Sequence, residues 1–326
     1  MRIVMMNGGL ANQTLQYIFA RYLEESTGEQ VLIDDTYFFR TQQLVDRNKE
    51  KQDACNLSGV HNGYELEYVF PAAPKPLLMS QNLTTDVLKY MAKKTYEHIY
   101  QALEADVPLQ LIGNGMEDLI VVFENISQKA ISAYTGKKFF VNPYEFNPDV
   151  AKIEGNVYFS GYWVTAGWLN AYRETLLNDL TFRPLTDSTN KHYEQEVRNN
   201  FSIGVHIRRG DFVKYGWATP ERNFKEALDN LKDKVPGNAR YFIFSDHLDW
   251  CKENMVALGI PRNAIFVEGN FDYQNNYIDM MLMSKCSILV FGASSFSFLA
   301  SLLNQRDGFK SIQIDDLYWV NSAQRR

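Results

Sequence analysis

The sequence predicts an α/β protein made of two doubly wound domains, each built around a parallel sheet. Residues 3–34 hold the first observation: an apolar strand, a glycine turn, a helix and a second strand follow one another. The second observation is a regular alternation of strand-like and helix-like segments between residues 203 and 303. Such alternation is typical of parallel strands joined by helical crossovers. At 326 residues the chain suits two ordinary domains, which we expect to span residues 1–185 and 186–326.

The amino-terminal unit follows from its apolar pattern. Residues 3–6 and residues 31–34 are predicted to form buried strands. The helix between them is expected to end at Gly28, because glycine is favoured at helix ends. Its apolar face has helical spacing and consists of Leu15, Ile18, Phe19, Tyr22 and Leu23.

The turn at residues 7–13 separates the first strand from this helix. It has neither the Gly-Lys-Ser/Thr ending of a phosphate loop nor the glycine spacing of a dinucleotide-binding turn. Asn12 and Gln13 stand at the start of the helix. There they could either contact a ligand or cap the helix.

The middle of the chain is less regular. Helical patterns are found at residues 86–105 and 116–133, and a strand is predicted at residues 156–163. Trp168 is expected to begin a further helix. Residues 181–191, which include a proline, are the predicted linker between the domains.

The carboxyl-terminal half shows the clearest alternation. Strands are predicted at residues 203–207, 241–244, 264–267 and 288–291. Helices are predicted at residues 223–232, 250–258, 277–284 and 295–303. Because parallel strands end at one common edge, the segments that follow them should meet there, and ligands bind at that edge in α/β sheets.

Composition limits the classes of function. The content of 45% hydrophobic and 22% charged residues is that of an ordinary globular protein, and the net charge of −6 argues against general nucleic-acid binding. No apolar run approaches the ~20 residues that span a bilayer. The three cysteines have no metal or disulfide spacing, and the first residues lack the apolar core of a signal peptide. We therefore expect a cytoplasmic protein, with peripheral association at the inner membrane left open.

The segment from Phe201 to Asp211 contains the strongest candidate site. Ile203, Val205 and Ile207 predict a strand, and charged residues follow where it ends. Side chains alternate along a strand, so His206 and Arg208 should point to one face and Arg209 to the other. Guanidinium groups bind oxyanions bidentately, which suits a phosphate ligand. The alternative is an exposed loop whose arginines pair with carboxylates.

Two further groups follow strands of the same predicted sheet. Asp246 comes after residues 241–244, and the turn Gly292–Ser295 comes after residues 288–291. The turn offers N–H groups, hydroxyls and a helix amino terminus to an anion. Asp246 could accept the N–H pair of a guanine edge. Each group also has an ordinary alternative as a helix cap, but together they predict a nucleotide-diphosphate site.

Five segments occur in an order that resembles a known family. They are Gly8–Gln13, His206–Asp211, Phe244–Asp246, Asp279–Ser284 and Ser294–Ser297. Together they resemble the bacterial α-1,2-fucosyltransferases of glycosyltransferase family 11. The resemblance implies a GT-B-like pair of Rossmann-like domains facing a cleft, a GDP-fucose donor, a galactoside acceptor and an inverting reaction. It also assigns Arg208 to the β-phosphate and Asp246 to guanine, with His206 nearby.

On this basis we assign the donor site to the carboxyl-terminal domain and the acceptor to the amino-terminal domain. The catalytic candidates are Arg208 and Asn12. The predicted residues of the donor site are His206, Arg208, Arg209, Asp211, Asp246, Ser294, Ser295 and Phe296. No metal is expected, because the chain lacks an Asp-x-Asp motif and Arg208 can supply positive charge. Asp34 is a candidate base, with structural pairing as its alternative.

The implied partners are GDP-fucose and a galactose-terminated glycan of surface polysaccharide such as O-antigen; a lipid-linked acceptor is left open. Several positions depart from the family pattern, among them Ala11 and His247. In addition, Ala293 replaces a usual Asn, and Phe298-Leu299 replace a Trp pair. The last two departures bear on sugar or acceptor preference. Transfer from another GDP-sugar, or non-catalytic binding of a nucleotide sugar or glycan, are the alternative functions.

Overall fold

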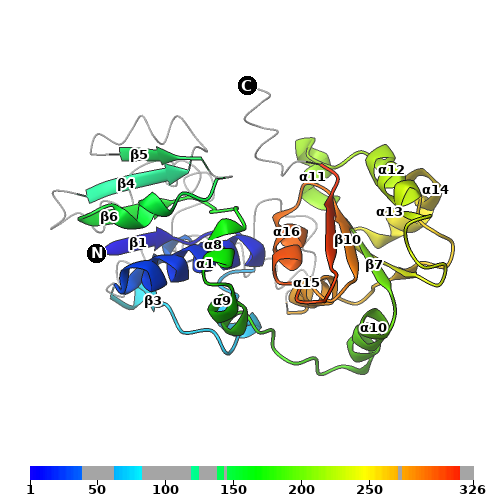
Figure 1. Cartoon of the computed structure of the whole chain (residues 1–326), viewed down its shortest axis with the longest axis horizontal. Coiled ribbons are helices and arrows are strands. Elements are labelled where there is room, and N and C mark those ends of the chain that lie inside the picture. Colours follow the sequence, from blue (N-terminus) through cyan, green and yellow to red (C-terminus); the bar gives the residue numbers. More distant parts are fainter. Residues whose placement is uncertain (39–61, 83–118, 125–137, 143–144, 271–273, 316–326) are drawn as a thin grey trace. The chain divides into compact units, whose positions relative to one another are not determined.

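The chain forms two compact units. The computed structural model describes residues 1–38, 62–82, 119–124, 138–142, 145–270 and 274–315 (Figure 1). Described residues up to Thr181 belong to the first unit and those from Phe182 onward to the second. Each unit has its own sheet, and all strand pairs found in the two sheets are parallel. The predicted class, a GT-B-like α/β protein with two Rossmann-like units, is confirmed.

The sheet of the first unit has the strand order β3-β2-β1-β6-β4-β5. Its strands are β1 (Arg2–Met5), β2 (Val31–Asp34), β3 (Leu77–Leu78), β4 (Leu119–Glu124), β5 (Lys138–Val141) and β6 (Asn156–Ser160). Helix α1 (Leu10–Thr27) connects β1 to β2, and the five apolar residues predicted for its inner face are all buried. It ends as predicted at Gly28, whose φ of 70° lets its N–H donate to the Glu24 carbonyl oxygen at 2.8 Å.

The remaining elements of the first unit are short. They are α3 (Leu66–Val69), η1 (Met79–Asn82), η2 (Pro148–Lys152), α8 (Gly167–Ala171) and α9 (Arg173–Asp179). The helix predicted at residues 116–133 is wrong for residues 119–124, which form β4 between β6 and β5. This run combines Ile and Val with Phe, and such β-branched and aromatic residues favour a buried strand. The helix predicted at residues 86–105 lies outside the described residues.

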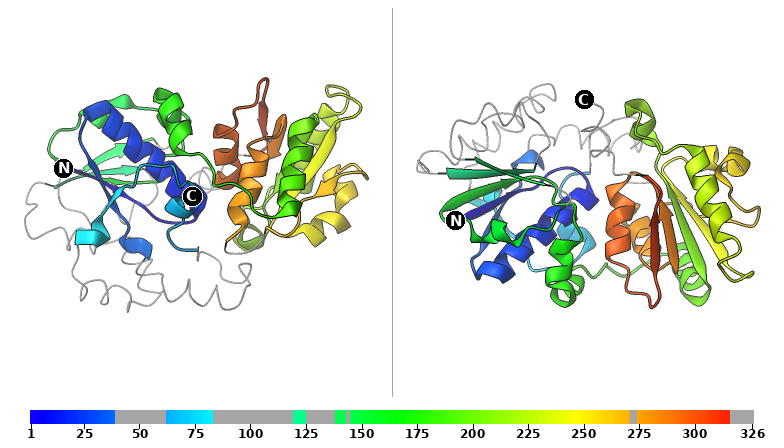
Figure 2. Two further views of the ribbon diagram at one scale, coloured as in Figure 1. Left: turned by 90° about the horizontal axis from the view of Figure 1, so that it is seen from below. Right: turned by 45° about the horizontal axis from the view of Figure 1, so that its top comes forward.

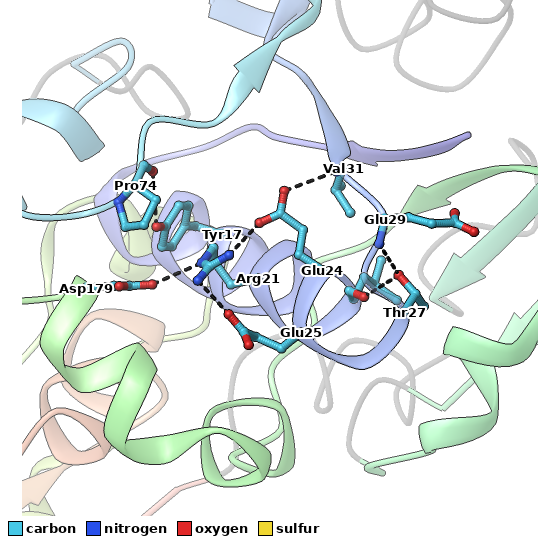
Figure 3. A network of polar contacts seen from close by, with 10 residues as sticks. Tyr17, Arg21, Glu24, Glu25, Thr27, Glu29, Val31, Pro74 and Asp179 are labelled. Carbon is cyan, nitrogen blue, oxygen red and sulfur yellow. Dashed lines mark hydrogen bonds and ion pairs between the residues drawn. The ribbon is translucent and has the colours of Figure 1, made fainter.

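Arg21 fastens α1 to the end of α9, the last helix of the first unit (Figure 3). Its guanidinium group contacts Asp179 at 3.0 Å, Glu24 at 2.7 Å and Glu25 at 2.8 Å. Glu24 also accepts the N–H of Val31 at 3.1 Å, at the start of β2. Burial lowers the pKa of Arg21, but the hydrogen bonds to Glu24 and Asp179 outweigh it and raise the pKa overall, so Arg21 stays charged. This network connects α1, α9 and the start of β2, close to the point where the chain passes to the second unit.

The second unit has a five-stranded sheet in the order β11-β10-β7-β8-β9. The strands are β7 (Ser202–Ile207), β8 (Arg240–Ser245), β9 (Ile265–Phe266), β10 (Ile288–Phe291) and β11 (Lys310–Gln313). The helices are α10 (Ser188–Asn199), α11 (Gly210–Tyr215), α12 (Glu221–Leu231), α13 (Leu248–Glu253), α14 (Met255–Leu258), α15 (Asn276–Met283) and α16 (Ser295–Leu302). In Figure 1 and Figure 2, α15 and α16 cover one face of this sheet and α12, α13 and α14 the other.

The sequence pattern explains most of these elements, and three details differ. Alternate residues of β7 and the apolar face of α12 meet in one buried core, which includes Ile203, Val205 and Phe224. The predicted linker at residues 181–191 is too long, because Asp187 caps α10 through a 2.7 Å bond from the N–H of Asn190. Helix α11 begins directly after Arg209, where no helix is predicted. Strand β11 was not predicted.

Candidate active site

The predicted site residues of the second unit gather at the carboxyl edge of its sheet. Strand β7 lies between β8 and β10, with His206 opposite Phe291 and Ile207 opposite Ser245. The segments after these three strands therefore leave the sheet side by side. They carry seven of the eight donor-site residues predicted from the sequence, and the eighth, His206, is in β7 itself.

Arg208 is held by two carboxylates just beyond the end of β7. Its Nη1 contacts Asp246 Oδ2 at 2.6 Å, and its Nη2 contacts Asp211 Oδ1 at 2.7 Å. The Asp246 side chain is only 4% exposed, whereas that of Arg208 is 35% exposed. The carboxylates fix the direction of the guanidinium group while part of it remains open to solvent. Such a preorganised cation suits an anionic ligand.

Gly210 allows Asp246 to approach this closely. A Cβ atom at residue 210 would lie 2.5 Å from Asp246 Oδ2, much closer than atoms in contact can come. Gly210 is also the first residue of α11, the helix that carries Asp211. The glycine of the motif thus has a packing reason that is independent of any ligand.

Arg209 points to the other face, as the alternation predicts. Its guanidinium carbon lies 3.5 Å from the ring centre of Trp250, and its Nη1 contacts Glu221 at 3.4 Å. Its backbone N–H donates to Asp246 Oδ1 at 2.8 Å. Stacking on an aromatic ring holds an arginine in place. This packing favours a positioning role for Arg209, and its direct contact with a donor stays a prediction.

His206 is buried beneath the edge rather than open to it. Its Nδ1 lies 3.0 Å from the Ser297 hydroxyl in α16, and its ring is 5.9 Å from that of Phe296. Burial, and secondarily the charge of Arg208, lower the pKa of His206 from 6.5 to about 3. The imidazole is therefore neutral at physiological pH. It connects the end of β7 to α16, and Phe296 joins it as a half-buried neighbour.

The lowered pKa of His206 predicts how stability depends on pH. The unfolded chain binds a proton at this residue below about pH 6.5, and the folded protein does not until about pH 3. The stabilisation is complete above pH 6.5 and is lost as the pH falls, by up to about 1.4 kcal/mol per pH unit for one proton. Replacing His206 with Gln should flatten this part of the profile, measured by urea unfolding between pH 7.5 and 5. An unchanged slope would contradict a buried neutral His206.

The turn at residues 292–295, which we call the serine turn, offers fewer backbone N–H groups to a ligand than expected. The Ala293 N–H donates to Thr219 Oγ1 at 3.2 Å, and the Ser294 N–H donates to the Gly292 carbonyl oxygen at 2.8 Å. Both N–H groups are thus engaged within the protein. Ser294 precedes α16 and is 4% exposed, yet its side chain makes no capping hydrogen bond to the helix. Its hydroxyl, with the half-buried Ser295 beside it, is what this turn can offer to an anion.

The first unit holds the other candidates. Asn12 lies in the first turn of α1 and is buried, close to Gly8, where a Cβ atom would be 2.6 Å from Asn12 Nδ2. Gln13 is structural: its side chain donates to the carbonyl oxygens of Gly8 and Gly63. Asp34 accepts hydrogen bonds from Tyr158 Oη at 2.6 Å and from the Thr36 N–H at 3.0 Å. The structural alternative for Asp34 therefore holds.

The Asp279–Ser284 segment also has a structural explanation. Asp279 accepts a 2.8 Å hydrogen bond from Asn270, which exchanges two more hydrogen bonds with Asn190 at the start of α10. Burial raises the pKa of Asp279 to about 7. The segment thus links α15 to α10.

Three contacts at this edge were not found from the sequence. Thr219 contacts the serine turn, Trp250 stacks on Arg209, and Ser297 bonds to His206. Thr219 and Trp250 lie in segments that show ordinary loop and helix patterns. Only Ser297 lies within a segment that the resemblance marked.

Two kinds of feature are absent from the described part of the chain. None of its helices is both long and apolar enough to cross a membrane. Among the same residues, His, Cys, Asp and Glu side chains nowhere form a group of three or more that could hold a metal ion.

Comparison with known proteins places the chain among glycosyltransferases. The alpha-1,2-colitosyltransferase of Escherichia coli is 28% identical over 57% of this chain and 66% of its own length. The O-antigen biosynthesis glycosyltransferase WbnK of Escherichia coli is 24% identical over 92% of this chain and 89% of its own. The galactoside alpha-(1,2)-fucosyltransferase 2 of Rattus norvegicus is 23% identical over 64% of this chain and 62% of its own. The chain thus spans just under two thirds of the first and third relatives.

The sequence model of the family described as glycosyl transferase family 11 matches residues 136–323, more than half of the chain. The match includes the whole edge formed by Arg208, Asp246 and the serine turn. This protein is a member of glycosyltransferase family 11.

Proposed function

We propose that this protein transfers L-fucose from GDP-fucose to the 2-hydroxyl of a galactoside, with inversion and without a metal ion. The observation that carries the proposal is the half-exposed Arg208, fixed by Asp211 and Asp246 at the sheet edge where α/β proteins bind ligands. Two relatives with α-1,2-transferase names support the linkage, and one of them is named for galactosides. The WbnK match supports a role in O-antigen or related surface polysaccharide.

The chemistry requires a stabilised leaving group. When the bond between fucose and the diphosphate breaks, negative charge develops on the β-phosphate. Arg208 can pair with that charge, and the Ser294 hydroxyl can donate a hydrogen bond to the same diphosphate. Asp211 and Asp246 hold Arg208 in place, and Arg209 holds Asp246 through its N–H. Ser295 and Phe296 at the start of α16, with His206 bonded to Ser297 in the same helix, complete the predicted donor site.

The acceptor is assigned to the first unit. Asn12 is the residue there that we propose to contact the acceptor or the transferred sugar, through its carboxamide. The acceptor is a galactose-terminated glycan, and a lipid-linked form would bring the protein to the inner membrane as a peripheral partner. The Asp34 carboxylate accepts hydrogen bonds from Tyr158 and Thr36, so we do not assign it as the base that removes the proton of the acceptor hydroxyl.

A GDP-linked colitose is a second candidate donor. The relative with 28% identity is named for transfer of colitose, which is L-fucose without its 3-hydroxyl group. Both sugars would present the same GDP group to the second unit. The site residues that contact GDP therefore do not separate these two donors.

A donor and acceptor screen tests the proposal. GDP-fucose, GDP-colitose, GDP-mannose and UDP-galactose are each incubated with a set of galactosides, and release of the nucleotide is measured. We expect release with GDP-fucose that depends on a galactoside acceptor. Binding of GDP-fucose without acceptor-dependent release would instead indicate a nucleotide-sugar-binding protein.

Transfer should survive removal of divalent metal ions. Arg208 supplies the positive charge at the diphosphate that a metal ion provides in metal-dependent transferases. After dialysis against excess EDTA, the rate of GDP release should stay within about twofold of the untreated rate. Loss of activity that magnesium or manganese restores would contradict this part of the proposal.

A further inference from the structure

A short segment between α11 and α12 joins two parts of the site that are far apart in the sequence. We call residues 217–221, the last of which is the first residue of α12, the bridging segment. The Trp217 N–H donates to the Phe212 carbonyl oxygen at 2.8 Å, which fixes one end to α11. At the other end, Glu221 pairs with Arg209 at 3.4 Å. The bridging segment is therefore attached at one end to α11 and at the other end to Arg209, just after β7.

The middle of the bridging segment contacts the turn that follows β10. Thr219 is 8% exposed, and its Oγ1 accepts the Ala293 N–H at 3.2 Å. Its side chain also occupies the space beside Gly292, where a Cβ atom would lie 2.1 Å from Thr219 Oγ1 and 2.8 Å from its Cβ. The contact thus depends on a hydrogen bond and on the missing side chain at residue 292.

This contact sets the conformation of the turn. With the Ala293 N–H bonded to Thr219 and the Ser294 N–H bonded to Gly292, two successive peptide groups have fixed directions. The second of these peptide groups belongs to Ser294, so the direction of its Cα–Cβ bond follows from them, and its hydroxyl makes no capping bond to α16. Thr219 therefore acts on that hydroxyl through the backbone.

We propose that Thr219 is a positioning residue for the diphosphate of the nucleotide. It holds the Gly292–Ser295 turn at a fixed place relative to Arg208, since the bridging segment is anchored to the elements on either side. The inference rests on the proposed function, because it assumes that a nucleoside diphosphate binds at this edge. It adds to the donor site a residue that lies outside the sequence motifs and that the pairing of Arg208 with the diphosphate does not require.

The first test compares variants of Thr219 by calorimetric titration of the full chain with GDP. Thr219→Val keeps the shape of the side chain and removes the acceptor oxygen, so the Kd for GDP should rise about 3- to 10-fold, the effect of one hydrogen bond. Thr219→Ser keeps the hydroxyl and should restore the Kd to within about twofold. In kinetic assays the KM for the donor should rise with Thr219→Val, while the KM for the acceptor stays unchanged.

The matched control lies at the opposite edge of the same sheet. The Ser287 hydroxyl accepts the Ser202 N–H at 3.1 Å, and both residues are buried at the amino ends of β10 and β7. Ser287→Ala removes a hydrogen bond of the same kind, from a backbone N–H to a hydroxyl, at the other end of β10. It should lower stability about as much as Thr219→Val but leave the Kd for GDP unchanged. An equal rise in Kd for both variants would overturn the positioning role.

A double-mutant cycle tests whether Thr219 acts through Gly292. Gly292→Ala should raise the Kd for GDP by more than about tenfold, because the new Cβ atom drives Thr219 and the turn apart. In a Thr219→Ala background the same change should have a clearly smaller effect, since part of the clash is gone. Equal effects in both backgrounds would overturn the proposal.

GDP binding by the wild-type protein separates the proposed function from the role of Thr219. If the wild-type protein shows no saturable GDP binding, the proposed function fails. If the wild-type protein binds GDP and Thr219→Val binds it equally well, only the positioning role of Thr219 is overturned.

Discussion

Replacing Arg208 with alanine should lower the rate of fucose transfer by about two to four powers of ten. The Arg208 side chain is 35% exposed and its guanidinium group is directed by Asp211 and Asp246, so it is well placed to pair with the leaving diphosphate. Losing charge-assisted hydrogen bonds of this kind costs on the order of 3–5 kcal/mol in the transition state. The measurement is kcat/KM for GDP-fucose with a saturating galactoside. Arg208→Lys, which keeps the charge but loses the fork, should be intermediate.

The control for this prediction is Arg240, at the amino edge of the same sheet. It is 42% exposed and pairs with Glu196, so it resembles Arg208 in exposure and pairing but not in position. Arg240→Ala should leave kcat/KM within about threefold. The folded fraction of each variant is measured by circular dichroism, because Arg208→Ala leaves Asp246 without its cation. A folded Arg208→Ala variant with more than a tenth of the wild-type rate would contradict the assignment.

Replacing Asp246 with asparagine should lower transfer by about 10- to 100-fold and weaken GDP and UDP binding by similar factors. Asp246 Oδ2 contacts Arg208 at 2.6 Å, and Oδ1 accepts the Arg209 N–H at 2.8 Å. Asparagine can still accept that N–H but cannot balance the charge of Arg208. A hydrogen bond to a charged group contributes about 1.5–3 kcal/mol, which sets the size of the effect. Titrations with GDP and UDP provide the measurement.

This result would separate two roles for Asp246. The family resemblance assigns it to guanine, and a residue that reads a polar base edge discriminates strongly between bases. The geometry instead favours a residue that orients Arg208, which affects both nucleotides alike. Glu196→Gln, the corresponding change at the pair with Arg240, serves as the control and should leave both affinities unchanged. If Asp246→Asn weakens GDP much more than UDP, the guanine assignment is correct.

Much of the fold could be predicted because its pattern is local. The parallel units follow from runs such as residues 203–207, where β-branched residues alternate with small or polar ones. Strand β4 was missed because its apolar run has no clear period, so its β-branched residues did not separate a strand from a helix until its place between β6 and β5 was known. Helix α11 was missed because Gly210 disfavours a helix by propensity. Its glycine is required instead by the approach of Asp246.

The sequence indicated which residues gather at the sheet edge, but it did not indicate which side chains they contact there. Arg208 and Arg209 lie just beyond β7 and take different partners, as the alternation of neighbouring side chains leads one to expect without tertiary information. The partner of each group, by contrast, comes from another part of the chain: Trp250 for Arg209, Ser297 for His206 and Thr219 for the turn. Such contacts are set by how β7, β8 and β10 bring their following segments together. No spacing within one segment contains that information.

The most direct test of the central claim is the structure of the product. The purified protein is incubated with GDP-fucose and a β-galactoside such as lactose, and the product is analysed by nuclear magnetic resonance. The account predicts one new fucose in α-configuration, inverted from the β-linked donor and attached to O2 of galactose. A β-linked fucose or attachment at another hydroxyl would contradict it, as would the absence of product when the same protein binds GDP-fucose.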